Sequence, residues 1–248
     1  MERHPDNPNR ILVYGGEWQC LPLLERQSPF IEEYLAINRA VMFRAFSRAK
    51  GCLVILFELR FPYAYACPEH GLITDFFRRL KEQIKANVKA RALRRGRMLD
   101  DRMDYIWARE RKEALHSHYH VAIFLDLAVY NGLGSLDLAI SQHSEYNLSP
   151  IVPAMASMAG RINRAWARAI GVPEASAVGL VHYPDNAVYR IATGDTDFVY
   201  SFLGLFRRLS YFAKSRTKDF TARGEPDWYG ASRAPRPVFS YSRPLSHE

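Results

Sequence analysis

Three histidines stand at alternate positions near the middle of the chain, His116, His118 and His120, and an apolar, β-prone run follows them at 121–124. In an extended strand, side chains two residues apart project from the same face, so all three imidazoles would point the same way. Imidazole nitrogens are common metal ligands, whereas histidines that are merely buried together need hydrogen-bond partners and repel each other once protonated. The spacing therefore favours a metal site, with a hydrogen-bonded histidine pair as the alternative.

A carboxylate stands just upstream of the histidines. Residues 103–109 predict a strand, a short charged connection follows at 110–115, and the histidine strand comes next. Two β-prone runs separated by so short a connection predict an antiparallel pair. Such a pair would bring Glu110 close to His118 and His120, and a solvated hairpin charge is the alternative for Glu110.

A tyrosine and several cations follow nearly a hundred residues later. Residues 197–218 predict a helix with a buried apolar stripe and a second, polar face. On that face Arg207, Tyr211, Lys214 and Lys218 follow one another at spacings of 4, 3 and 4. Tyr211 would face either a functional site or the sheet, where it would be an ordinary packed aromatic side chain.

A second helix, predicted over about 74–95, is strongly basic. Among its positive side chains are Arg78, Lys85 and Lys89, and Glu82 alone opposes them between 78 and 97. Such a run is either a solvated face or a surface that contacts phosphates. Arg78, Lys85 and Lys89 are therefore candidate contacts to nucleic acid.

The remaining patterns predict an α/β (α+β) protein with a largely antiparallel central sheet and flanking helices, because most of its strands would pair as hairpins. The other predicted elements are a helix over 28–50, a strand over 52–61, a helix over 150–170, and a hairpin with strands at 178–183 and 188–191.

The amino-acid composition limits which kinds of protein and partner are expected. The 248 residues, 48% hydrophobic and 24% charged, suit one folded domain at 28–222, with an extended lead-in at 1–27 and an irregular, proline-containing tail at 223–248. A formal charge of +8 favours a polyanionic partner, nucleic acid ahead of an acidic membrane surface. Three scattered cysteines indicate a reducing compartment. With no signal peptide and no membrane-spanning run, we expect a cytoplasmic protein without a membrane partner.

Together these pieces resemble the motifs of HUH endonucleases, which nick one DNA strand to start rolling-circle replication. They look most like the replication initiators of filamentous phages (inovirus gene II type) and their prophage relatives of the YagK/YfjJ type. The resemblance covers roughly residues 50–233. Its five motifs stand in the family's order at 105–110, 118–124, 179–183, 207–214 with Lys218 following, and 230–233, which reads Gly-Ala-Ser-Arg.

The resemblance implies the HUH endonuclease fold and a metal-dependent nickase that also rejoins DNA ends. A divalent ion, manganese or magnesium, would be held by His118, His120 and Glu110. His116 or Glu58 could replace Glu110 as the third ligand.

The resemblance also implies a nucleophile and a DNA-binding face. Tyr211 would attack the DNA backbone and leave a 5′-phosphotyrosine and a free 3′-hydroxyl, while Lys214 would favour the phenolate or hold a phosphate oxygen. Arg207 and Lys218 would contact DNA, and Tyr200 is the candidate for a second nucleophile. Because the chain has no G-x-x-x-x-G-K-S/T phosphate loop, a host helicase would separate the strands of the origin and a host polymerase would extend the nick.

Two other functions use part of the same pattern. A DNA-binding prophage regulator would keep the fold without turnover and would need neither the histidines nor Tyr211. A metal-dependent hydrolase that uses water would need the histidines but not Tyr211. A zinc deaminase is disfavoured because no H-x-E precedes a P-C-x-x-C.

Overall fold

The computed structural model describes residues 2–67, 69–111, 116–134, 156–218, 220 and 228–233. Within these ranges the centre of the molecule is a six-stranded sheet in the order β10-β6-β8-β7-β11, with β9 also paired to β6. Every pairing in this sheet is antiparallel, as the sequence predicts. Its strands are β6 (Gly51–Leu59), β7 (Asp104–Glu110), β8 (His118–Asp126), β9 (Val181–His182), β10 (Val188–Ala192) and β11 (Tyr229–Ala231).

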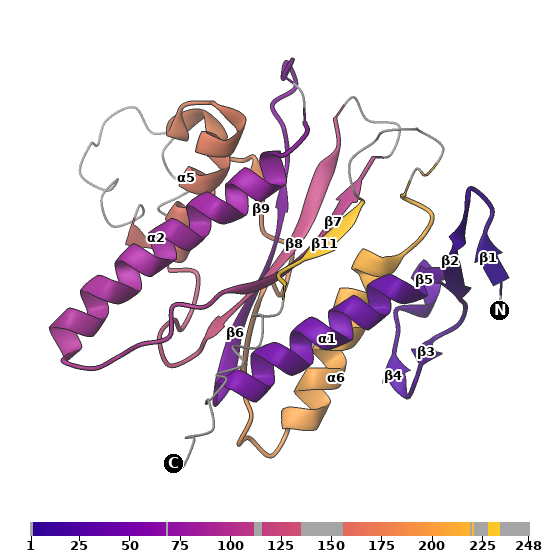
Figure 1. Ribbon diagram of the computed structural model, residues 1–248, viewed down its shortest axis with the longest axis horizontal. Coiled ribbons are helices and arrows are strands. Elements are labelled where there is room, and N and C mark those ends of the chain that lie inside the picture. The colour runs from indigo at the N-terminus through magenta and orange to yellow at the C-terminus, as the bar shows by residue number, and fades with distance from the viewer. Residues whose placement is uncertain are drawn as a thin grey trace, which may run out of the picture.

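Helices cover both faces of this sheet (Figure 1). One face packs against α2 (Leu72–Arg95) and α5 (Met158–Ile170), and the other packs against α1 (Glu32–Arg48) and α6 (Phe198–Leu209). Side chains alternate along each strand, so Val121 and Ile123 of β8 belong to the α2/α5 core, while Ala122 and Phe124 belong to the α1/α6 core. None of the described helices combines the length and the apolar character needed to cross a membrane.

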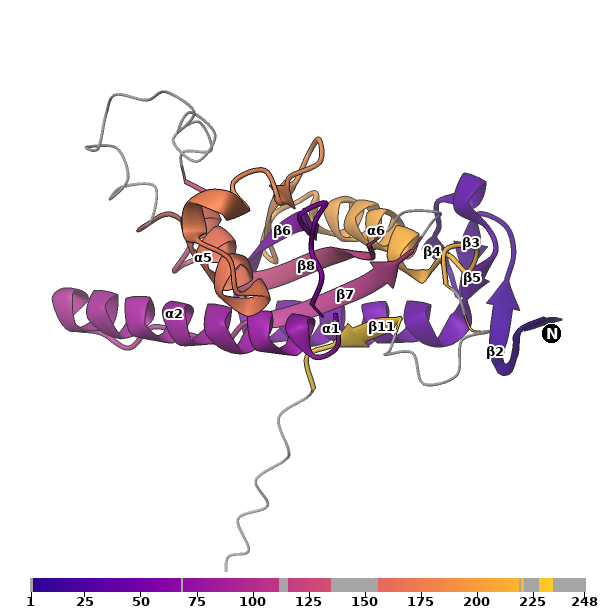
Figure 2. The ribbon, with the colours of Figure 1, turned by 90° about the horizontal axis from the view of Figure 1, so that it is seen from above.

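The N-terminal segment is extended, as expected for 1–27, but it is part of the α1/α6 core and not a separate lead-in. Leu12, Trp18 and Leu23 are buried in that core. Two views of the molecule place the N-terminal strands beside α1 and α6, away from α2 (Figure 1, Figure 2). The elements are β1 (Glu2–His4), β2 (Asn7–Val13), β3 (Glu17–Trp18), β4 (Leu21–Pro22), a 3-10 turn η1 (Glu25–Gln27) and β5 (Phe30–Ile31).

Two helices begin later than the sequence predicts. The helix predicted over 28–50 begins only at Glu32, because Phe30 and Ile31 pair with β2 as a short strand. The helix predicted over 150–170 begins at Met158, where the Ser157 hydroxyl accepts a hydrogen bond from the Gly160 backbone N–H at 3.0 Å. Residues 150–155 lie outside the described part of the chain.

The hairpin predicted at 178–191 is wrong. Strands β9 and β10 both pair with the same edge of β6, His182 opposite Glu58 and Val188 opposite Ile55, instead of pairing with each other. The segment between them leaves the sheet edge at Asn186, whose φ of 55° is in the left-handed region. The chain thus forms one interrupted edge strand.

The helix predicted over 197–218 ends at Leu209 and continues as a 3-10 turn, η4 (Ser210–Ala213). The N-terminal segment holds the chain here, since the Leu24 backbone N–H donates to the Ser210 hydroxyl at 3.0 Å. Beyond the turn, the Ser215 N–H donates to the Pro29 carbonyl at 2.9 Å. Tyr211, Lys214 and Lys218 therefore do not share one face of an α-helix.

Candidate metal centre and neighbouring tyrosine

Strands β7 and β8 bring the predicted carboxylate and histidines together. Glu110 is the last residue of β7 and lies directly opposite His118, the first residue of β8. His120 stands two residues further along β8 and projects from the same face of the sheet. The antiparallel pair expected from the short connection thus forms in the register that places Glu110 beside both histidines.

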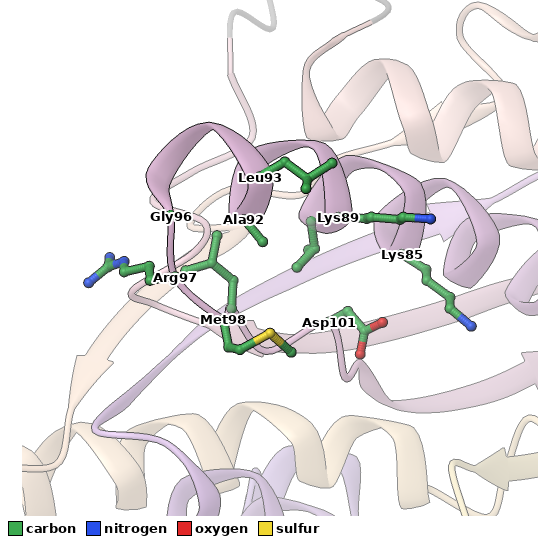
Figure 3. A pocket seen from close by; sticks show the side chains of 10 residues that line it. Lys85, Lys89, Ala92, Leu93, Gly96, Arg97, Met98 and Asp101 are labelled. Atoms are coloured by element: carbon green, nitrogen blue, oxygen red, sulfur yellow. The ribbon is translucent and has the colours of Figure 1, made fainter.

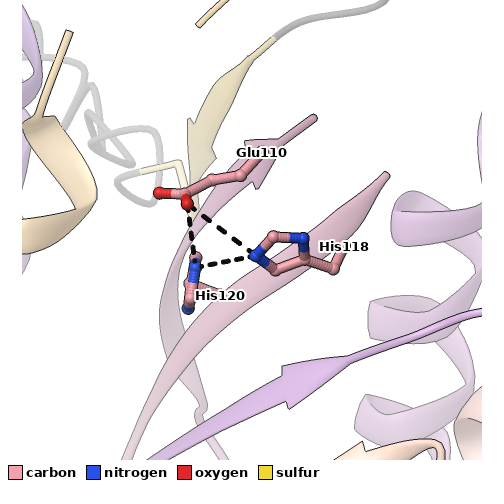
Figure 4. A group of neighbouring side chains, drawn as sticks. All are labelled: Glu110, His118 and His120. Atoms are coloured by element: carbon pink, nitrogen blue, oxygen red, sulfur yellow. Dashed lines mark hydrogen bonds and ion pairs between the residues drawn. The ribbon is translucent and has the colours of Figure 1, made fainter. Parts of the chain in front are cut away.

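These three side chains form a compact group of metal-ligand type (Figure 4). The Nε2 atoms of His118 and His120 are 3.1 Å apart, and Oε2 of Glu110 lies 3.2 Å from Nε2 of His120 and 3.7 Å from Nε2 of His118. One ligand atom from each residue lies within 4.8 Å of the others. Two imidazoles and one carboxylate are a mixed nitrogen and oxygen donor set that fits a divalent metal ion.

The protonation of the group also suits a metal. Burial and the neighbouring His120 lower the pKa of His118 to about 4, so its imidazole is neutral at pH 7. Burial alone would raise the pKa of Glu110, but the hydrogen bond from His120 and the charges of the nearby lysines hold that pKa well below its ordinary value. At neutral pH the site presents an ionised carboxylate and a neutral imidazole, the forms that bind metal.

His116 lies outside this group, so the expectation that three histidines face the same way is wrong. Strand β8 begins only at His118, and the backbone before it does not keep the strand's alternation. The His116 ring contacts the Tyr63 carbonyl oxygen at 3.1 Å and Oε1 of Glu69 at 3.4 Å. These contacts direct it away from His118.

Glu58 faces the other side of the His120 ring. It lies opposite His120 in the pairing of β6 with β8, with Oε1 3.4 Å from Nδ1 of His120. Its second oxygen lies 2.6 Å from Nη2 of Arg60 and 3.6 Å from Nδ1 of His182. A carboxylate on one ring nitrogen orients a histidine so that the other nitrogen can bind a metal. Glu58 thus lies where a carboxylate could orient His120 without binding the metal itself.

Two lysines approach Glu110 from the C-terminal segment. The Nζ atoms of Lys214 and Lys218 lie 2.9 Å and 3.6 Å from Oε1 of Glu110, and both side chains are almost fully buried. Burial lowers the pKa of Lys218 to about 8, although Glu110 counteracts this. The sequence places Lys218 on a DNA-contacting face, whereas the structure places it inside the molecule beside Glu110.

Tyr211 packs directly against the candidate metal centre. The centre of its ring is 5.1 Å from that of His120, with the two rings nearly perpendicular, and Nζ of Lys214 lies 3.3 Å from the ring centre. Burial, together with the negative charges of Glu110 and Glu58, raises the pKa of Tyr211 to about 12. Tyr211 also packs against the α1/α6 core, so its position beside His120 suits both a functional tyrosine and an ordinary packed aromatic side chain.

A cavity of about 190 Å³ adjoins the tyrosine, and Glu58, His120 and Tyr211 all contribute to its wall. Two cationic side chains, Arg26 and Arg208, also line it. Neither arginine is among the site residues expected from the sequence. Arg26 is distant from His120 and Tyr211 along the chain, and no local sequence pattern marks it as a site residue. The wall of the cavity thus combines a tyrosine, a histidine of the candidate metal centre and positive charge, a combination that suits an anionic ligand.

Other predicted site residues lie elsewhere. Arg207 is exposed, and Tyr200 is 82% exposed on α6 with no contact to the cluster among the described residues. Lys85 and Lys89 are exposed on α2, on the opposite face of the sheet. Arg78 shares that helix, where it pairs with Asp75 and Glu82.

The Gly-Ala-Ser-Arg run at 230–233 has a structural role at the far end of β7. Gly230 lies against the Trp107 indole, which a Cβ atom there would approach to 2.6 Å. The Ser232 hydroxyl donates to Oδ1 of Asp104 at 2.8 Å, and Arg44 donates to both Asp104 and Ser232. These contacts hold β11 at the edge of the sheet.

Fold and site together define an α/β protein whose antiparallel sheet carries a two-histidine, one-glutamate candidate metal centre beside a tyrosine. The chain belongs to the YagK/YfjJ C-terminal domain family, whose model matches residues 17–226. It is 31% identical to the uncharacterized protein YagK of Escherichia coli K12 over 165 residues, which are 64% of this chain and 67% of YagK. It is 27% identical to the uncharacterized protein YfjJ of the same organism over 160 residues, 63% of this chain and 69% of YfjJ. No solved structure is significantly similar to the chain.

Proposed function

We propose that this protein is a metal-dependent HUH endonuclease that nicks and rejoins single-stranded DNA to initiate rolling-circle replication of a phage or prophage element. The observation that carries the proposal is the packing of Tyr211 against His120, within the group that His120 forms with His118 and Glu110. A DNA-binding regulator without turnover needs no such group. A hydrolase that uses water needs the group but not the tyrosine.

The candidate metal ligands fit a manganese or magnesium ion. Glu110, His118 and His120 would hold it, and a bound divalent ion would neutralise charge on the scissile phosphate. Glu58 would hold Nδ1 of His120, and the lysines beside Glu110 would fix its carboxylate.

In the proposed reaction, the Tyr211 hydroxyl oxygen attacks the phosphorus of a DNA phosphodiester. The new bond joins phosphorus to the tyrosine oxygen, and the bond from phosphorus to the 3′-oxygen breaks. The phenolic proton is lost to solvent, and the departing 3′-oxygen gains a proton to become a 3′-hydroxyl. Since the phosphotyrosine is itself a phosphodiester, the reverse reaction can rejoin the strand.

Lys214 has two roles in this proposal. Its ammonium lies between the Tyr211 ring and Glu110, where its positive charge favours the phenolate as the proton leaves. The same ammonium adds to the effect of the His120 hydrogen bond and of Lys218, which lower the pKa of Glu110 and hold this carboxylate ionised. Arg26 and Arg208 line the adjoining cavity and would receive the phosphate.

The biological setting is proposed from the same resemblance. The substrate would be single-stranded or supercoiled origin DNA in the cytoplasm of a bacterial host, with a host helicase and polymerase completing replication. One tyrosine in contact with the cluster favours a single-tyrosine cycle, since Tyr200 is exposed on α6.

The test is incubation of the purified protein with 5′-labelled and 3′-labelled single-stranded DNA from the origin of its own element, with Mn²⁺, followed by denaturing electrophoresis. We expect a protein band that carries the 3′-side label, present with Tyr200→Phe and absent with Tyr211→Phe. Cleavage without an adduct would support the hydrolase instead, and binding without cleavage would support the regulator.

A further inference from the structure

An open groove lies at the C-terminal end of α2, where the chain turns back along the helix (Figure 3). Its volume is about 560 Å³, and its apolar lining includes Val88, Leu93, Met98 and Leu99. Leu93 is 76% exposed and Met98 is 93% exposed. Large apolar side chains that are both exposed and line one groove are typical of a surface that binds a partner.

A glycine cap shapes the backbone of the groove. Gly96 ends α2 in the left-handed conformation, with φ 61°, and the N–H of Arg97 donates to the Ala92 carbonyl at 3.3 Å. This cap turns the chain so that Met98 lies beside the last turns of the helix, as Figure 3 shows. The groove runs from Lys85 to Gly96, about 16 Å along the helix axis, which matches roughly three turns of a partner helix.

Positive charge surrounds the groove. Lys85, Lys89 and Arg97 line it, and in Figure 3 their charged ends project away from its apolar floor. Between residues 83 and 99 the sequence has six lysines and arginines and no acid. Within the described ranges, no ion pair involves Lys85, Lys89 or Arg97. Arg78, in contrast, is neutralised by Asp75 and Glu82 further up the same helix.

A second, cationic pocket adjoins the groove and shares Lys85 and Asp101 with it. This pocket has a volume of about 280 Å³ and adds Lys81 and Arg233 to the basic rim, whereas Arg102, which also lines it, is paired with Asp100. The apolar floor and the basic rim therefore form one continuous surface, which lies across the sheet from Glu110 and Tyr211.

We propose that this surface binds an amphipathic, acidic helix of a partner protein, with apolar side chains on Leu93 and Met98 and carboxylates on the lysines of the rim. A helix in an apolar groove with complementary charge at its edges is a common mode of recognition. The chain's own charge of +8 disfavours a second copy as the occupant. None of the residues lining the groove is aromatic, so it lacks the stacking platforms on which single-stranded nucleic acids bind.

The test is selection from a phage-displayed library of 18-residue helical peptides against the full chain, followed by fluorescence anisotropy of the enriched peptides. We expect enriched sequences with leucine-type residues at i, i+3 or i+4, and i+7, flanked by aspartate and glutamate. Leu93→Glu with Met98→Glu should weaken their binding at least tenfold. The matched control, Val199→Glu, alters an apolar side chain that is 66% exposed on α6 and should leave binding unchanged. Lys85→Glu with Lys89→Glu should weaken binding about fivefold and reduce its dependence on salt.

Several results would overturn this proposal. They are the absence of any enriched peptide, enriched peptides without an acidic bias, and peptides that bind the Leu93/Met98 double variant as well as the wild type. A 20-nucleotide single strand or a vesicle of anionic phospholipid that binds the wild type but not the double variant, while no peptide binds, would reassign the groove to that ligand. The test needs no nicking activity, so its outcome does not depend on the proposed function.

Discussion

Lys214 connects the tyrosine to the candidate metal centre: its ammonium lies 3.3 Å from the centre of the Tyr211 ring and 2.9 Å from Oε1 of Glu110. One buried cation thus neutralises the carboxylate of the candidate metal centre and faces the proposed nucleophile. Because Lys218 also lies beside Glu110, the carboxylate retains one positive neighbour when Lys214 is removed. The consequences of losing Lys214 can therefore be observed in a folded protein.

We expect Lys214→Met to lower the free energy of unfolding by about 2–3 kcal/mol, somewhat less than the loss of an entire buried ion pair. The same variant should slow formation of the covalent DNA adduct at least 100-fold. Denaturant unfolding and single-turnover kinetics measure the two effects. Arg190→Ala, which removes an exposed cation on β10, opposite Leu53, is the control and should retain both stability and rate. A Lys214→Met protein with wild-type kinetics would remove Lys214 from the proposed reaction.

The candidate metal ligands can be tested without DNA. Isothermal titration with Mn²⁺ should show one site in the wild type. Replacing a residue that only orients a metal ligand typically costs 10–100-fold in metal affinity. The proposed ligands would bind the metal directly. We therefore expect at least that loss with each of His118→Ala, His120→Ala and Glu110→Ala. His116→Ala is the matched control, because the His116 ring contacts Tyr63 and Glu69 instead of the cluster. A loss of affinity with His116→Ala equal to that with His118→Ala would contradict the assignment.

Glu58 should act on the metal through His120. We expect Glu58→Ala to weaken Mn²⁺ binding about tenfold, since Nδ1 of His120 loses its carboxylate partner. Glu58→Gln keeps an oxygen that can face Nδ1 of His120 and should recover part of the affinity. Complete loss of the metal with both variants would instead make Glu58 a direct ligand, and unchanged affinity with Glu58→Ala would show that it does not orient His120.

Asp104 should make stability depend on pH at the edge of the sheet. Burial alone would raise the pKa of Asp104, but the hydrogen bond from Ser232 and the charges of Arg48 and Arg44 lower it overall. A carboxyl with a depressed folded-state pKa stabilises the fold above its unfolded pKa, about 3.9, and this contribution is lost as the pH falls through the folded-state pKa.

Asp104→Asn should therefore reduce the free energy of unfolding by about 2–3 kcal/mol at pH 7, slightly less than for a fully buried pair because the two arginines remain partly exposed. The difference from the wild type should stay constant down to about pH 5 and shrink below pH 4. Urea unfolding across this range measures it. A difference that grows as the pH falls would contradict the charge state assigned to Asp104.

The sequence predicts the part of the site that depends on neighbouring strands. A short connection between two β-prone runs is enough to place Glu110 beside His118 and His120, because antiparallel pairing is local and its side-chain alternation is regular. It also predicts the antiparallel sheet and the extents of β6 and α2 to within a few residues.

The rest of the site depends on contacts between distant segments. The end of α6 at Leu209 follows from bonds to Leu24 and Pro29, almost two hundred residues earlier, and these bonds turn Lys218 inward. The expectation for His116 failed because β8 starts two residues later and Glu69 offers another partner. Likewise, the 178–191 hairpin failed because β6 has an open edge that accepts both strands. Periodicity along the chain does not encode such competition.

The most direct test of the central claim is mass spectrometry of the covalent protein–DNA adduct after nuclease and trypsin digestion. Trypsin releases Tyr211 in the peptide 209–214 and Tyr200 in the peptide 191–207, so the two tyrosines are separated. We predict that a nucleotide is attached through a 5′-phosphotyrosine to peptide 209–214 and is absent from peptide 191–207. A nucleotide on any other peptide, or no adduct from DNA that the protein demonstrably cleaves, would contradict the assignment of Tyr211 as the nucleophile.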